Sequence, residues 1–75
     1  MSSLRELDIK IIDWETRYIL ESISKEMQRL KLINETSDDE DEASDAGNDF
    51  IELSGLYKRL SSEAISKFGA QIIEF

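Results

Sequence analysis

Apolar residues recur at intervals of three and four positions along most of this chain. In the first half the pattern runs from Leu4 to Ile33, with Glu, Arg and Lys between the apolar positions. No Pro or Gly interrupts this stretch, and Ser3 and Glu6 have the spacing of a capping box, which marks a helix N-terminus. The sequence therefore predicts one long helix over about residues 3–33.

A second helical pattern begins inside a strongly acidic segment. Its apolar residues alternate spacings of three and four, as in the a and d positions of a heptad repeat. Ser37 and Glu40 again have capping-box spacing, and carboxylates in a first helical turn interact favourably with the helix dipole. These features predict a second helix over about residues 38–68, followed by a short apolar tail, residues 70–75.

The start of the second helix has two possible positions. Gly47–Asn48–Asp49 is the weakest point of the pattern, because a Gly inside a helix costs about 1 kcal/mol relative to Ala. If the helix breaks there, Asn48 or Asp49 caps a shorter helix that begins at Phe50. The second helix then starts at either Asp38 or Phe50.

The connection between the two predicted helices is short. Residues 34–37 form the turn, and so short a loop requires the helices to be antiparallel neighbours. With the turn centred there, Met27 should lie opposite Ala43 and Gly47. The predicted fold class is all-α, with an antiparallel helical hairpin of two long helices in a single domain, residues 1–75.

The first predicted helix carries a second apolar stripe, about 100° around from the first. A single hairpin partner cannot cover both stripes, and exposed apolar patches of this kind usually mark an interface. We therefore predict a homodimer in which two hairpins form a four-helix bundle. The predicted dimer interface consists of residues of this second stripe and of residues in the C-terminal part of the chain: Leu4, Leu7, Ile11, Trp14 and Tyr18, with Ile65, Phe68 and Ile72.

Chain length and composition narrow the possible functions. The chain has 75 residues, and a domain of this size buries only about 60% of its unfolded surface, so it usually needs a disulfide, a metal or a second subunit. It contains no Cys and no His, which removes disulfides, the commonest zinc ligands and the usual pairing of a nucleophile with a base. We expect no enzymatic activity, no metal and no cofactor.

Almost all of the net charge lies in one segment. The whole chain has a net charge of −8, and residues 36–49 contain seven carboxylates and no Lys or Arg. An EF-hand loop needs Gly at its sixth position, but loops starting at Asp38 or Asp41 have Ala there. The acidic balance disfavours direct binding to nucleic acid or anionic membranes. The carboxylates predicted to bind a basic partner are Asp38, Asp39, Glu40, Asp41, Glu42 and Asp45.

Together these patterns predict a small acidic protein–protein interaction module, such as an adaptor, an inhibitor or an antitoxin- or immunity-like protein. It would present its acidic helix end to a basic protein. The alternative is a structural subunit or chaperone-like component of a larger complex, in which Trp14 and Tyr18 dock on another protein and the acidic run serves only solubility. No apolar stretch is long enough for a membrane span or a signal peptide, so we expect a cytoplasmic protein with no membrane contact.

Overall fold

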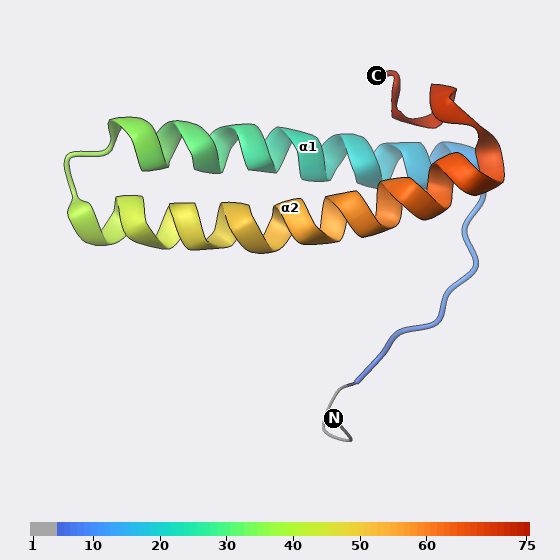
Figure 1. The fold of residues 1–75 in the computed structure, drawn as a ribbon, viewed down its shortest axis with the longest axis horizontal. Coiled ribbons are helices and arrows are strands. Elements are labelled where there is room, and N and C mark those ends of the chain that lie inside the picture. The colour runs from blue at the N-terminus through green and yellow to red at the C-terminus, as the bar shows by residue number, and fades with distance from the viewer. Residues whose placement is uncertain (1–4) are drawn as a thin grey trace.

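The chain forms an all-α hairpin. The computed structural model describes residues 5–75, so the predicted cap residue Ser3 and the predicted interface residue Leu4 lie outside the described residues. Helix α1 spans Asp13–Thr36, helix α2 spans Glu40–Phe68, and a short 3₁₀ helix, η1, spans Ala70–Ile73. The two long helices lie side by side and antiparallel (Figure 1), which confirms the predicted hairpin.

Helix α1 begins later than the sequence predicted. Residues 5–12 are not helical, so the predicted start near residue 3 is wrong for this segment. The N-cap of α1 is Ile12, whose N–H donates to Glu15 Oε1 at 2.9 Å. The Ile12 carbonyl accepts from both the N–H and the hydroxyl of Thr16, each at 3.0 Å. These bonds satisfy backbone groups that a helix terminus leaves without intrahelical partners.

Two physical effects explain the late start. Ile9, Ile11 and Ile12 are β-branched, and their restricted χ1 rotamers lower helix propensity. In addition, α2 ends at Phe68, so a longer first helix would extend past the partner that it packs on. Tertiary packing supplies most helical stability in proteins, and residues 5–10 are all exposed.

The turn also lies later than predicted. Helix α1 continues to Thr36, and the turn is formed by residues 37–39 instead of 34–37. The N–H of Ser37 donates to the Ile33 carbonyl at 2.9 Å, so Ser37 is the C-cap of α1 and not the N-cap of α2. Helix α2 starts at Glu40 rather than Asp38, and it runs unbroken through Gly47, which excludes the alternative start at Phe50.

The register of the two helices differs from the prediction because the turn has moved. Asn34 Nδ2 donates to the Ala43 carbonyl at 2.8 Å. A Cβ on Gly47 would lie 2.6 Å from the same Asn34 nitrogen. Ala43 and Gly47 therefore lie opposite Asn34 rather than Met27, which is seven positions earlier in α1. The absence of a side chain at Gly47 makes room for this bond between the helices.

The main hydrophobic cluster lies at the open end of the hairpin, away from the turn. Leu20 is fully buried there, packed with Ala64 and Ile72. Gly69 adopts a left-handed φ of 96°, which Gly tolerates without steric cost and which lets the chain turn from α2 into η1. The half-buried side chains that pack against this cluster are Tyr57, Leu60, Ile65, Phe68 and Ile73.

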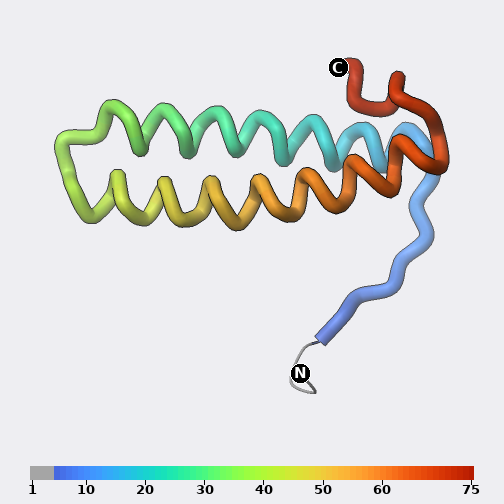
Figure 2. The backbone as a smooth tube through the Cα atoms, in the orientation of Figure 1, coloured from blue at the N-terminus to red at the C-terminus, as the bar shows by residue number. Residues whose placement is uncertain are grey.

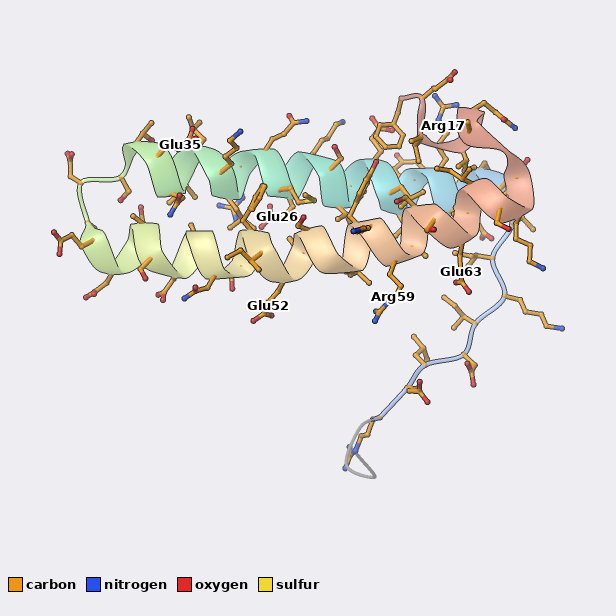
Figure 3. The ribbon with its side chains drawn as sticks, in the orientation of Figure 1. Arg17, Glu26, Glu35, Glu52, Arg59 and Glu63 are labelled. Atoms are coloured by element: carbon orange, nitrogen blue, oxygen red, sulfur yellow. The ribbon has the colours of Figure 1, made fainter. Side chains whose placement is uncertain are left out.

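Segment η1 covers one side of the open end. The Arg17 guanidinium donates to the Glu74 carbonyl, which ties the C-terminal segment to α1. Figure 3 shows Arg17 pointing toward this segment. The predicted tail is thus part of the core of the hairpin, and Ile72 is buried in it.

Candidate functional site

The turn end of the hairpin carries a cluster of carboxylates, here called the acidic tip. Two of them have structural tasks. Asp39 Oδ1 accepts from the backbone N–H groups of Asp41 and Glu42, at 2.9 and 3.3 Å, and so caps α2. Glu42 Oε1 accepts from the Ser37 hydroxyl at 2.9 Å. All members of the acidic tip are exposed, and they are the residues predicted from sequence: Asp38, Asp39, Glu40, Asp41, Glu42 and Asp45.

No basic side chain neutralises the acidic tip within residues 5–75. The two ion pairs found there, Lys25–Glu21 and Arg29–Glu26, both lie along α1 and do not involve the tip. The tip carboxylates spread around the end of the hairpin, and no three acidic residues in the described part of the chain converge on a possible metal position. The positive end of the α2 dipole offsets only part of this charge. The arrangement is a solvated, strongly negative surface.

The ion pair between Glu26 and Arg29 on α1 changes the pKa of both groups. Arg29 Nε and an Arg29 terminal nitrogen donate to the two carboxylate oxygens of Glu26, at 2.8 and 2.6 Å. The hydrogen bonds and the charge of Arg29 hold the pKa of Glu26 below its ordinary value, and the same contact raises the pKa of Arg29. Both groups are on the surface, so the pair is a local helix contact rather than part of a site.

A second surface consists of exposed apolar side chains at the open end. Trp14 and Tyr18 are 61% and 69% exposed, as expected of a stripe that α2 does not cover. Leu7 is 82% exposed and Ile11 is half-buried, but both lie in the extended segment before α1. The sequence predicted that both residues continue the helical stripe of Trp14, but neither of them is in a helix.

The other predicted interface residues lie in the chain's own core. Ile72 is buried against Leu20, and Ile65 and Phe68 pack around the same cluster. Nothing in the sequence pattern indicates that η1 folds back over the hairpin and covers these residues within the chain itself. The predicted interface is thus divided between a free surface and a surface that this chain covers itself.

An open groove that the sequence did not predict lies between the two helices. It is lined by Glu26 and Leu30 of α1 and by α2 residues that include Leu53 and Leu56. Two further α2 carboxylates, Asp49 and Glu52, complete the lining. The signal in the sequence was Leu56, a large aliphatic residue outside the heptad-like positions of the second predicted helix. The groove mixes aliphatic and acidic side chains and so has the same negative character as the tip.

The described part of the chain contains no helix that is both long enough and apolar enough to cross a membrane. No protein-family model, curated protein or solved structure matches the chain. Any function assigned to the acidic tip and to the apolar open end therefore depends on their chemistry alone.

Proposed function

We propose that the chain is a cytoplasmic, non-catalytic interaction module that binds a basic protein through its acidic tip. The observation that carries this proposal is the exposure of all six tip carboxylates without a Lys or Arg partner in residues 5–75. A concentrated negative field attracts a cationic surface, speeds association and orients the encounter. The hairpin holds these charges at one end of a rigid pair of helices.

The test uses a defined cationic probe, a peptide of ten lysines, titrated against the full chain at low and high salt. A variant that carries Asp38→Asn, Asp41→Asn and Asp45→Asn removes three charges from the tip without removing the Asp39 cap. Binding should weaken about tenfold or more, and salt should weaken the wild type in the same way, because both changes reduce the same attraction.

The matched control removes three charges elsewhere, through Glu52→Gln, Glu63→Gln and Glu74→Gln. Figure 3 shows Glu63 projecting from α2 away from α1, and all three residues are exposed. Because the net charge changes equally in the two variants, only a local site weakens the tip variant more. Equal affinities for the two variants would contradict the proposal and would favour a role in solubility alone.

Homodimerisation belongs to the same proposal, with Trp14 and Tyr18 as the apolar contact that would join two hairpins into a four-helix bundle. Two large aromatic side chains exposed side by side on one helix support it, since such residues are typical anchors of interfaces. Trp14→Ala should shift the mass in solution from dimer toward monomer without reducing helix content. A dimer that is equally stable in this variant would show that the aromatic pair is not the contact.

The second candidate function is a structural subunit of a larger complex. The same exposed aromatic pair supports it, because a different protein could cover Trp14 and Tyr18 permanently. The mass of the purified chain separates the two candidates. A stable dimer favours the interaction module, whereas aggregation or a monomer without fixed packing favours a missing obligate partner.

A further inference from the structure

The segment before α1, residues 5–12, is an extended stretch of chain that belongs to no helix and no sheet. Figure 2 shows it leaving the open end and running away from both helices. Residues 5–10 are all exposed, including Leu7 and Ile9. Within the described part of the chain, the backbone groups of residues 5–11 take part in no hydrogen bond. The backbone groups on both sides of this extended segment are therefore open to pairing.

The side chains of this segment alternate with a period of two. Leu7, Ile9 and Ile11 are aliphatic, and they alternate with three charged residues, Glu6, Asp8 and Lys10. In an extended chain successive side chains point to opposite faces, so the three aliphatic residues share one face. This pattern is typical of a strand that is buried on one side, and two of the three aliphatic residues are β-branched, as strands favour.

The segment is also complementary to itself when two copies run antiparallel. With Ile9 opposite Ile9, each Leu7 lies opposite Ile11 of the other copy. Asp8 of each copy then lies opposite Lys10 of the other copy, so opposite charges face each other on both sides of Ile9. Opposite charges directly across an antiparallel pair are stabilising and like charges are destabilising. Neighbouring registers, which pair other residues with Asp8, lose this match.

We propose that two copies of the chain join through an antiparallel two-stranded ribbon of residues 6–12, with its twofold axis at Ile9. The inference rests on the homodimer of the proposed function and names the segment that joins the copies. The second copy is the occupant because the charge pattern matches its own reverse, and because residues 5–75 contain no strand to pair with. The ribbon places Leu7, Ile9 and Ile11 of both copies on one face. Trp14 and Tyr18 lie in the first turns of α1, directly after the ribbon, and their apolar side chains would pack on that face.

Charge exchange at the central pairs tests the register. Asp8→Lys alone places Lys opposite Lys10, and Lys10→Asp alone places Asp opposite Asp8. Each single variant should form a homodimer about tenfold weaker than the wild type. Mixing the two variants should restore affinity and give mainly the heterodimer, which native mass spectrometry resolves from either homodimer. The double variant, with both changes in one chain, should also recover the wild-type affinity.

A matched pair of variants separates ribbon pairing from general attraction between oppositely altered chains. Asp49→Lys and Lys58→Asp make the same changes in net charge at exposed positions of α2. When these two are mixed, homodimers and heterodimers should appear in statistical proportion. A preference for the heterodimer as strong as that of the segment variants would overturn the proposal, and so would a wild-type monomer at 100 µM.

A cysteine placed on the proposed twofold axis gives an independent readout. The chain has no Cys, so a single introduced thiol reports only on its own neighbours. Ile9→Cys should form a covalent dimer on mild oxidation, because residues directly opposite in an antiparallel pair are within reach of a disulfide. Ile51→Cys, at an exposed aliphatic position of α2, is the control and should cross-link at least tenfold more slowly. Equal rates in a chain that is nevertheless dimeric would overturn the ribbon and leave a dimer made through the helices.

Discussion

The two ends of the hairpin are stabilised by different kinds of interaction. At the open end Leu20, Ala64 and Ile72 are buried together, and η1 covers them. In the half nearer the turn, burial is limited to Leu30 and Ala46, and hydrogen bonds hold the end itself: Asn34 donates to the Ala43 carbonyl, and Asp39 accepts from the first N–H groups of α2. Apolar burial supplies most of the free energy of folding, whereas caps and polar contacts determine where helices start and stop. The open end therefore contributes more stability, and the turn end determines the register.

The largest effect should follow from truncating the core of the open end. Leu20 has no exposed surface, so Leu20→Ala leaves a cavity and should lower the free energy of unfolding by about 2–5 kcal/mol. That loss is comparable to the whole stability of a marginal domain. Urea unfolding followed by circular dichroism measures it.

Leu32→Ala is the matched control in the same helix, because Leu32 is 60% exposed and should lose little. If the two variants unfold at the same urea concentration, the open end does not dominate stability, and the contrast between the two ends is wrong.

At the turn end the effect should be smaller and specific to one carboxylate. Asp39→Ala removes the side chain that accepts from Asp41 and Glu42, and should cost about 1 kcal/mol. Asp38→Ala removes a neighbouring charge that makes no cap, so stability should stay the same or rise as repulsion is relieved. Thermal unfolding of the two variants at one ionic strength measures the difference. Equal losses would mean that charge rather than capping determines the start of α2.

The sequence was sufficient for the elements that long periodic patterns specify. Two helices and their antiparallel arrangement follow from apolar spacing, a short connection and the absence of Pro, whereas the sequence left the continuity of α2 through Gly47 open. The exposed carboxylates of the acidic tip also follow, because a dense acidic run has no way to be buried. These features depend on local composition, which the sequence displays directly.

Helix boundaries and tertiary folding could not be predicted in the same way. Ser37 and Asp39 both have suitable cap side chains, and only the three-dimensional turn decides that Asp39 caps α2 while Ser37 ends α1. The period of two in residues 6–11 does not exclude a helix, because Leu7 and Ile11 also fit a helical spacing of four. The return of Ile72 onto Leu20 depends on the left-handed turn at Gly69, a tertiary contact that no periodicity reveals.

Two glycines of α2 sharpen the comparison at the scale of single helix positions. A Cβ at Gly55 would meet no atom within 4 Å, so Gly55→Ala should stabilise the hairpin by about 0.5–1 kcal/mol through helix propensity alone. A Cβ at Gly47 would displace the Asn34 side chain and break its bond to the Ala43 carbonyl. Because that bond is worth about 1 kcal/mol, Gly47→Ala should gain little or nothing. Equal gains in melting temperature would show that the Asn34 contact adds no stability.

The smallest effect should come from the exposed ion pair midway along α1, which belongs to neither end. Arg29 holds the pKa of Glu26 below its ordinary value of 4.5 through hydrogen bonds and charge. A lowered carboxylate pKa means that the pair stabilises the folded state fully above about pH 4.5, and that this contribution is lost as pH falls through the folded pKa. Glu26→Gln should therefore lower the melting temperature slightly at pH 7 and by less at pH 2.5, because acid protonates a growing fraction of the wild-type carboxylate. Melting curves at the two pH values measure this, with Glu52→Gln as a control that has no ion pair in the described part of the chain. A difference that persists unchanged at pH 2.5 would assign the effect to side-chain packing rather than to the charge of Glu26.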